Sequence, residues 1–314
     1  MAKAKKRTDI HGWVVFDKPV GMTSTQAVGK IKWLFNVKKA GHAGTLDPLA
    51  SGCLPIALGE ATKTVSYVVG GRKLYEFAVR WGSQTTTEDA EGEVVVSSDN
   101  RPDRDSILAV LEQFTGEISQ TPPAFSAIKV DGKRAYDLAR AGIDVKLNAR
   151  PVTIYSLELV EIVDSDTARF RAQTSKGTYI RSLGRDLALS LDTCGHIVEL
   201  RRLNTGPFQE NHMISLEKLE TLRNSAPGEE NLANALRPIE TALDDIPALA
   251  VDRNGAARLR RGQSVLLRGR DAPIHHGLVY ATCAGELVAL AEVDQAELHP
   301  RRVFNLSPAP VSDA

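Results

Sequence analysis

The sequence is poor in aromatic residues, in cysteine and in long apolar segments. It holds 8 Phe, 6 Tyr and 3 Trp among 314 residues, which does not indicate a sheet of exposed aromatics that reads RNA by stacking. The three cysteines (Cys53, Cys194 and Cys283) form no CxxC pair, so the sequence signals neither a disulfide framework nor a zinc site, and core thiols are predicted. No apolar run approaches the roughly 20 residues of a membrane helix, and the short one at 13–16 does not make a secretory signal. We therefore expect a cytoplasmic protein with no structural metal and no membrane contact.

Neither sign of charge is in excess, because 39 Lys and Arg balance 39 Asp and Glu. The charges are nevertheless segregated: nine basic and two acidic groups in residues 1–40, two and nine in residues 86–117, and seven and three in residues 169–202. Local blocks set the field that a polyanion meets, so the neutral total does not exclude a nucleic-acid partner. Solvated surface charge explains the same pattern, and composition does not choose between the two.

An ordinary content of 42% hydrophobic and 25% charged residues indicates a globular chain, and the length indicates two domains or one large domain with an appendage. Alternating and helical spacings bounded by turn and capping residues predict a mixture of strands and helices. They place strands at 12–17, 74–81, 93–96, 152–163 and 167–175, and helices at 24–35, 106–114, 182–191 and, with a break at Pro227-Gly228, 217–245. Beyond residue 247, short β-rich segments predict a small β-barrel at 263–268, 278–282, 287–293 and 303–306. Residues 1–10 are expected to form a basic flexible arm and residues 307–314 a disordered tail.

Several motifs that bind nucleotides or activate water are missing. The sequence has no GxGxxG after a strand, no GxxxxGK[ST], no HExxH, no GxSxG and no zinc-deaminase pattern. What remains is the dense segment Ala40–Gly52, in which His42 and Asp47 stand among three glycines. Taken alone, Asp47 before Pro48 is a common turn residue, and His42 is a loop histidine that bonds a backbone carbonyl.

Residues 41–52 closely resemble the catalytic motif of the TruB family of tRNA pseudouridine synthases. Other stretches are similar to the remaining motifs of that family in the same order and spacing. These are Asp17–Ser24, Lys73–Phe77, Thr121–Arg140, Lys176–Leu187 and Gly195–Arg202. The resemblance covers about 11–247 and is followed by a piece that resembles a PUA-type RNA-binding barrel. It implies an α+β pseudouridine synthase fold with a central mixed, largely antiparallel sheet, an RNA-gripping insertion at about 120–150, and a PUA-like domain at 248–306.

The resemblance also implies the catalytic residues. Asp47 is the essential carboxylate, which attacks the sugar, adds to the base or removes a proton from C2′; the sequence leaves these three routes open. Arg181 favours the ionised form of such a carboxylate, and Tyr75 stacks on the uracil that has been flipped out of the RNA.

Further residues are implied as contacts to the substrate. His42 fills the space that the base vacates, Tyr179 and Leu200 line the base pocket, and Lys18 supports the site or contacts a phosphate. The basic residues of the insertion are expected to contact the RNA backbone. They are Lys129, Lys133, Arg134 and Arg140.

The implied reaction converts uridine 55 in the T loop of tRNA to pseudouridine. The base is flipped out, the N1–C1′ bond breaks, and C5 is joined to C1′. No electrons leave the uridine and no group is exchanged with another molecule, so no cofactor is expected. The expected partner is the T arm of tRNA, bound without a guide RNA by a monomer, more weakly as salt rises, with an accessory tRNA-folding activity. The acidic block 86–117 is expected to face away from the RNA.

Three alternatives remain open at this point. An RNA-binding or tRNA-folding module would bind without catalysis, a guide-dependent relative of the dyskerin type would need a ribonucleoprotein, and a base-excising glycosylase would release free uracil.

Overall fold

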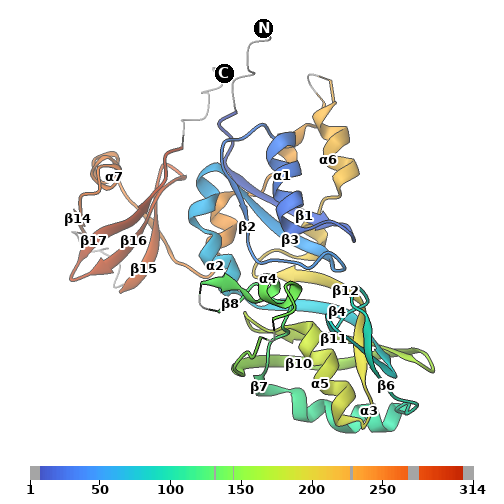
Figure 1. The fold of residues 1–314 in the computed structure, drawn as a ribbon. Helices are drawn as coiled ribbons and strands as arrows, with labels where there is room; N and C mark the ends of the chain where they lie inside the picture. Colours follow the sequence, from blue (N-terminus) through green and yellow to red (C-terminus); the bar gives the residue numbers. More distant parts are fainter. Residues whose placement is uncertain (1–7, 131, 144, 227–228, 268–275, 307–314) are drawn as a thin grey trace.

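The computed structural model describes residues 8–130, 132–143, 145–226, 229–267 and 276–306 (Figure 1). The strands are β1 Gly12–Lys18, β2 Ala40–His42, β3 Ser51–Leu58, β4 Lys73–Trp81, β5 Ser83–Thr85, β6 Val94–Ser97, β7 Gly116–Gln120, β8 Lys129–Val130, β9 Lys133–Arg134, β10 Arg150–Asp164, β11 Thr167–Thr174, β12 Gly195–Thr205, β13 Ala248–Ala250, β14 Val265–Leu266, β15 Gly277–Cys283, β16 Glu286–Asp294 and β17 Glu297–Val303. The α-helices are α1 Ser24–Leu34, α2 Val65–Gly70, α3 Arg104–Val110, α4 Ala135–Arg140, α5 Ile180–Ser190, α6 Leu216–Arg223 and α7 Arg253–Arg260. The 3₁₀ helices are η1 Gly59–Lys63, η2 Leu111–Phe114, η3 Glu210–His212, η4 Leu232–Ala235 and η5 Ile239–Leu243.

One large sheet organises the first 247 residues. Its strand order is β1-β3-β12-β4-β11-β10-β7, and β2 pairs with β3 beside this path. The strands pair antiparallel, except that β3 and β12 run parallel where Ser51 and Gly52 face Arg201 and Arg202. The expected α+β fold with a mixed, largely antiparallel sheet is confirmed.

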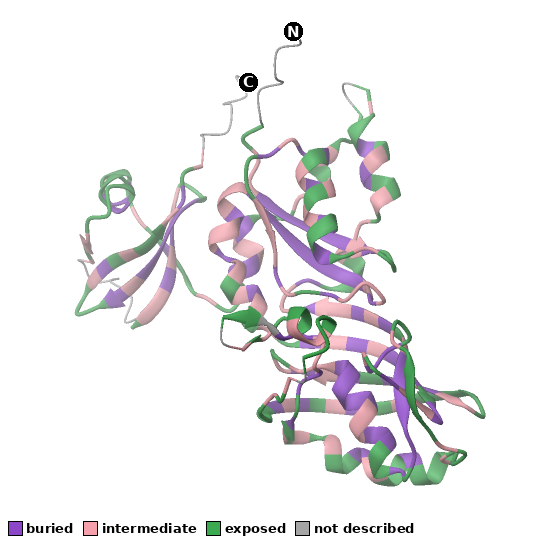
Figure 2. Ribbon diagram, viewed as in Figure 1, coloured by how far each residue is buried: buried purple, intermediate pink, exposed green. Residues whose placement is uncertain are grey.

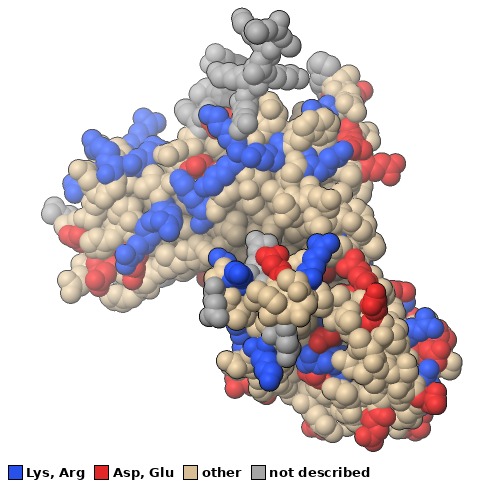
Figure 3. All heavy atoms as spheres, viewed as in Figure 1, with Lys and Arg blue, Asp and Glu red and all other residues tan. Residues whose placement is uncertain are grey.

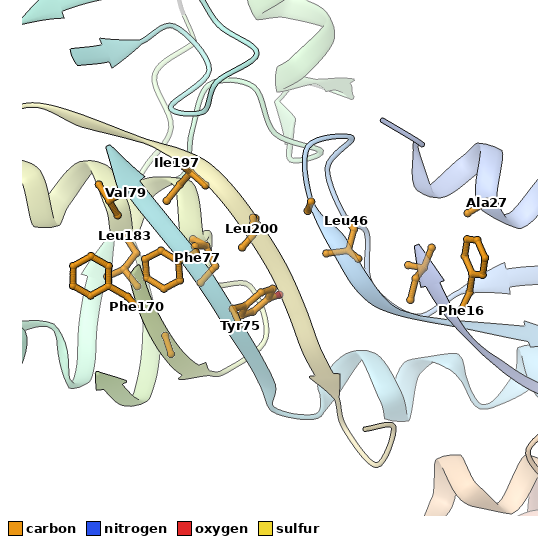
Figure 4. Close-up of a cluster of buried hydrophobic side chains, with 14 of the residues drawn as sticks. Phe16, Ala27, Leu46, Tyr75, Phe77, Val79, Phe170, Leu183, Ile197 and Leu200 are labelled. Carbon is orange, nitrogen blue, oxygen red and sulfur yellow. The ribbon is translucent and has the colours of Figure 1, made fainter. Parts of the chain in front are cut away.

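Helix α5 covers one face of this sheet and supplies much of its core (Figure 2). Ile180, Leu183 and Leu187 recur at helical spacing and are buried. They belong to the same apolar cluster as Phe77 and Phe170 of the sheet (Figure 4). Full burial of each such side chain contributes about 1.5–3 kcal/mol, so the first turn of α5 is held firmly over the sheet.

Helix α1 begins at Ser24 because Thr23 and Gln26 form a capping box. The Thr23 hydroxyl accepts a hydrogen bond from Gln26 N, and Thr23 N donates to Gln26 Oε1 at 2.9 Å. The helix packs against β2 and β3 and ends one residue before the predicted end. The turn that precedes it is therefore fixed next to the loop between those two strands.

A second sheet, in the order β13-β15-β16-β17-β14, forms the C-terminal unit (Figure 1). In the described part of the chain its edge strands β13 and β14 do not pair with each other, so the small β-barrel expected from the sequence takes the form of a curled half-barrel sheet. Strand β17 occupies Glu297–Val303, and the prediction of a strand at 303–306 was therefore misplaced. Pro300 stands at an irregularity in the pairing with β16, a position where a proline is tolerated in a sheet. The same proline made this strand hard to recognise in the sequence.

An apolar cluster joins the two sheets. Leu290 and Phe304 from the C-terminal unit belong to one buried group with Trp13 and Phe208. The rings of Trp13 and Phe208 lie 5.1 Å apart between centroids. Phe16, also on β1, packs into the main core on the opposite face from Trp13. Strand β1 is consequently buried on both faces.

Other expectations differ from the structure in detail. Residues 217–245 do not form a near-continuous helix: α6 ends at Arg223 and only the short 3₁₀ helices η4 and η5 follow. Helix α7 was not predicted. Residues 1–7 and 307–314, expected as most of the arm and as the tail, lie outside the described residues, together with Pro227, Gly228 and Arg268. Thr8, within the expected arm, pairs with Val37. Cys53 and Cys194 are buried thiols as predicted, and Cys283 is half-buried.

Candidate active site

The loop Ala43–Ala50 connects β2 to β3 and is held from the neighbouring turn. Ser24 Oγ donates to Leu46 O at 2.9 Å and accepts from Leu46 N at 2.8 Å. Gly44 adopts a φ of +98°, a conformation that L side chains rarely take. These contacts fix Asp47 close to the point where β3 and β12 pair in parallel.

Arg181, in the first turn of α5, reaches this loop. Its Nε donates to Asp47 Oδ2 at 2.9 Å. The Arg181 side chain is 6% exposed and that of Asp47 is 37% exposed, so a buried guanidinium holds a carboxylate that remains open to the solvent. A charge-assisted hydrogen bond of this kind is short and directional, so it fixes the orientation of the Asp47 carboxylate.

The guanidinium of Arg181 is itself oriented by three other groups. Its Nη1 donates to Thr87 O and its Nη2 to Phe125 O, both at 2.9 Å. Asp89 Oδ2 lies 3.6 Å from Arg181 Nε, and the Asp89 side chain is 3% exposed. Asp89 belongs to the acidic block 86–117 and lies beside Arg181, but it is not among the residues that line the pocket, so the expectation that this block faces away from the RNA stays a prediction. A count of charges could not show that an arginine of α5 neutralises this carboxylate.

A pocket of about 580 Å³ lies beside the ion pair, within the usual range of about 300–1,000 Å³ for small-molecule sites. Tyr75 on β4 and Leu200 on β12 contribute apolar surface to it and lie on adjacent strands (Figure 4). In that view the Tyr75 hydroxyl points away from Phe77 and Phe170. The residues predicted from the sequence that line this pocket are His42, Asp47, Tyr75, Tyr179, Arg181 and Leu200.

Burial shifts the pKa values of two side chains that line the pocket. Burial, and next the charge of Arg202, lower the pKa of His42, so its imidazole is neutral at pH 7. Burial raises the pKa of the Tyr179 hydroxyl. The backbone of Tyr179 is held by Gln120, a residue that sequence reasoning did not assign: Gln120 Nε2 donates to Tyr179 O at 3.1 Å, and Tyr179 N donates to Gln120 Oε1 at 2.9 Å.

Lys18 does not line this pocket. Its buried Nζ donates to the carbonyls of Pro19, Met22 and Pro48 at 2.9, 2.6 and 3.4 Å. Burial lowers the pKa of this amine to about 8, although the charge of Asp47 raises it. Because the ammonium is directed at the backbone of the neighbouring loop, the geometry favours support of that loop over contact with a phosphate.

Sequence reasoning assigned no role to two buried cations of the pocket, Lys73 and Arg202. Lys73 Nζ donates to Val69 O and Gly71 O at 2.5 Å each, and burial lowers the pKa of this amine to about 8. A signal was present in the sequence. Lys73 stands two residues before Tyr75 and Arg202 two residues after Leu200, and residues two apart on a strand share a face.

The basic residues proposed as RNA contacts lie on the insertion next to the pocket. Lys129 on β8, Lys133 on β9 and Arg140 at the end of α4 are exposed. The side chain of Arg134 lies outside the described part of the structure. Figure 3 shows Lys and Arg side chains over α7 and the second sheet and onward across the adjoining part of the molecule, whereas the end that carries α3 shows Asp and Glu mixed with Lys and Arg.

Within the described ranges, no group of three His, Cys, Asp or Glu side chains is close enough to hold a metal ion. No helix among the same residues is long and apolar enough to cross a membrane.

A partly exposed carboxylate that is held by a buried arginine, beside a pocket lined by Tyr75, is an arrangement suited to nucleophilic or acid–base catalysis. Comparison with known proteins agrees. Residues 32–180 match the model of the TruB family pseudouridylate synthase N-terminal domain, and residues 181–244 match that of the tRNA pseudouridylate synthase B C-terminal domain. The chain belongs to the TruB family of pseudouridylate synthases, which are isomerases.

Full-length relatives and solved structures support this placement. A tRNA pseudouridine synthase B of Bradyrhizobium diazoefficiens is 62% identical over 304 residues, 96% of this chain and 88% of the relative. The protein of the same name from Agrobacterium fabrum is 53% identical and covers 95% of this chain and 96% of the relative. A chain of the crystal structure of a Cbf5-Nop10-Gar1 complex matches with a TM-score of 0.73 and 30% identity, over 94% of this chain and 85% of that chain.

Proposed function

We propose that the chain isomerises uridine 55 in the T loop of tRNA to pseudouridine. The observation that carries this proposal is the hydrogen bond between Arg181 and Asp47 beside a pocket lined by Tyr75, in a chain of the TruB family. Relatives that match nearly the whole chain are named for action on tRNA, which favours tRNA as the substrate here. The position of the uridine follows from the motif resemblance at residues 41–52.

The reaction needs one ionised carboxylate and a place for the base. The N1–C1′ bond breaks, the uracil turns, the C5–C1′ bond forms, and the proton lost from C5 is balanced by one gained at N1. Asp47 starts the sequence by attack on C1′, by addition to the base or by removal of the C2′ proton, and the hydrogen bond from Arg181 orients its carboxylate for each route. The uracil stacks on Tyr75, which contributes about 1–3 kcal/mol toward the few kcal/mol that base flipping costs.

The remaining residues of the pocket hold the flipped nucleotide. Leu200 and Tyr179 enclose the base, and the neutral imidazole of His42 enters the RNA loop where the base was. Lys18 supports the loop of Asp47 through its contact with Pro48 O. No cofactor takes part in these steps.

Recognition of the T arm rests on shape and charge. We assign residues 11–247 to the catalytic domain and 248–306 to a PUA-like RNA-binding domain, with the insertion 120–150 closing on the RNA through Lys129, Lys133, Arg134 and Arg140. The basic surface over α7 supports this path (Figure 3). The proposal includes action as a monomer, without a guide RNA, in the cytoplasm, and an accessory tRNA-folding activity.

Tritium release tests the proposal. Purified protein is incubated with a tRNA transcript tritiated at uracil C5, and release of one tritium per tRNA with modification mapped to the T loop is expected. Asp47→Asn should abolish release while tRNA binding persists. Asp105→Asn, which changes an exposed carboxylate of α3, is the matched control and should turn over normally.

Each contrary result would point to a different function for the chain. Binding without tritium release would indicate an RNA-binding or folding module. Release only after addition of a second RNA would indicate guide dependence. The appearance of free uracil would indicate a glycosylase, and an active Asp47→Asn variant would refute the assigned chemistry.

A further inference from the structure

Arg202 is a buried cation without an anionic partner. It is 1% exposed and is among the largest fully buried side chains of the protein. No ion pair joins it to an Asp or Glu of the described residues. Taking a guanidinium out of water is unfavourable unless its donors are well satisfied, so its retention in the core calls for a physical reason.

Every nitrogen of this guanidinium donates to the backbone around Asp47. Nε donates to Cys53 O at 2.8 Å, Nη2 to Gly44 O at 3.0 Å, and Nη1 to Thr45 O at 3.3 Å. Gly44 and Thr45 precede Asp47, and Cys53 follows it on β3. One planar group therefore spans both ends of the loop that carries the carboxylate.

Two glycines lie against Arg202, one against its side chain and one against its backbone. A Cβ at Gly44 would lie 3.5 Å from Arg202 Nη1, and a Cβ at Gly52 would lie 2.3 Å from Arg202 O. Both glycines have positive φ, +98° and +96°. Gly52 thus allows β3 to approach the backbone of Arg202 more closely than a residue with a Cβ would, and a Cβ at Gly44 would be in ordinary van der Waals contact with the guanidinium.

The same strand position links the loop to the base pocket. Arg202 on β12 pairs with Tyr75 on β4 on one side and with Gly52 on β3 on the other. Its charge also lowers the pKa values of His42 and Lys73, after the larger effect of burial. Arg202 therefore touches both the wall that holds the base and the loop that holds the carboxylate.

We propose that Arg202 is a positioning residue: its guanidinium fixes the loop of Asp47, so that the carboxylate meets Arg181 and the flipped nucleotide in a reactive geometry. The inference rests on the proposed function for its kinetic consequence, but the fixing of the loop is independent of turnover. Misplacement of a reacting group by about 1 Å lowers rates by about 100-fold, which sets the scale of the expected effect.

The kinetic experiment compares Arg202→Met with Arg201→Met, at the next position of the same strand. Arg201 points to the opposite face and pairs with Asp17 and Glu210, so it is a matched control. With tritiated tRNA, kcat of Arg202→Met should fall about 10- to 100-fold with KM within about threefold, while Arg201→Met stays near wild type. Guanidinium ion at millimolar concentration should restore part of the kcat of Arg202→Ala, by occupying the vacated space.

A second variant and a second measurement guard against misfolding and against an inactive wild type. Arg202→Lys keeps the charge, but its single nitrogen does not span both ends of the loop, so kcat should fall in a folded protein. Hydrogen exchange of free protein should be faster in peptide 43–53 of Arg202→Met and Arg202→Lys, and unchanged in β10 and β11. A wild type that releases no tritium refutes the proposed function and leaves the exchange result to decide the loop.

The role of Arg202 is overturned by any of three results. These are unchanged exchange of peptide 43–53 in both variants, a folded Arg202→Lys protein with the wild-type rate, or a loss of turnover that appears in KM alone.

Discussion

Arg181 holds two carboxylates of very different burial, and this predicts a sharp asymmetry in stability. Asp89 is 3% exposed and lies 3.6 Å from Arg181 Nε. Replacement of Arg181 by Met leaves that carboxylate buried without a cation, although Thr87 Oγ1 and Glu91 N still donate to it at 2.5 and 3.0 Å. Removal of one partner of a buried pair costs about 3–5 kcal/mol. Asp47 is 37% exposed, so its pairing with Arg181 is screened and contributes no more than about 1 kcal/mol.

Two double-mutant cycles, one for Arg181 with Asp47 and one for Arg181 with Asp89, compare the two coupling free energies by urea unfolding at pH 7. Asp47→Asn should change the free energy of unfolding by less than about 1 kcal/mol while abolishing turnover. Arg181→Met should destabilise by about 3–5 kcal/mol, and Asp89→Asn added to it should restore most of that loss. Equal coupling of Arg181 to both carboxylates, or a double variant with Asp89→Asn that is no more stable than Arg181→Met, would refute the reasoning.

The remaining predictions concern the pocket and the insertion. The folded-state pKa of Lys73 is about 8 against 10.5 in the unfolded chain, so between these values only the unfolded chain keeps the proton. Wild-type stability relative to Lys73→Met should therefore rise over that pH interval in urea titrations, and a constant difference would contradict this. Gly52→Ala should lower the thermal midpoint, since a positive φ costs about 1–2 kcal/mol and the added Cβ would meet Arg202 O at 2.3 Å; an unshifted midpoint sinks the claim. Lys129→Ala should reduce the salt slope of tRNA binding by about 1 in filter-binding titrations with kcat unchanged at saturation, and an unaltered slope removes Lys129 from the interface.

Local patterns in the sequence predicted much of the fold. The alternation in β4, the hairpin of β10 and β11, the capping box of α1 and the amphipathic spacing of α5 all lie within short segments. Strands β3 and β12 were not predicted, because Gly52 and Pro55 interrupt the first and charged residues the second. Their parallel pairing joins segments far apart in the chain, so no local pattern reports it.

The site was predictable as a set of residues but not as a geometry. Motif resemblance named Asp47, Arg181 and Tyr75, and these do line one pocket. Asp89 was hidden because it belongs to an acidic stretch whose partner is an arginine about 90 residues later in the chain. Arg202 was hidden because its burial depends on the junction of β3 and β12, which only the folded sheet creates.

The burial of β1 on both faces makes the two units of this enzyme inseparable in engineering terms. A chain truncated near residue 247 would lose Leu290 and Phe304 from the buried cluster that also holds Trp13 and Phe208, and would leave part of that cluster uncovered. Such a fragment would expose an apolar patch and would tend to associate with other molecules. A chimaera that carries the C-terminal unit of a distant relative would need apolar side chains at the positions of Leu290 and Phe304. The apolar contact between the two units therefore limits which chimaeras can fold.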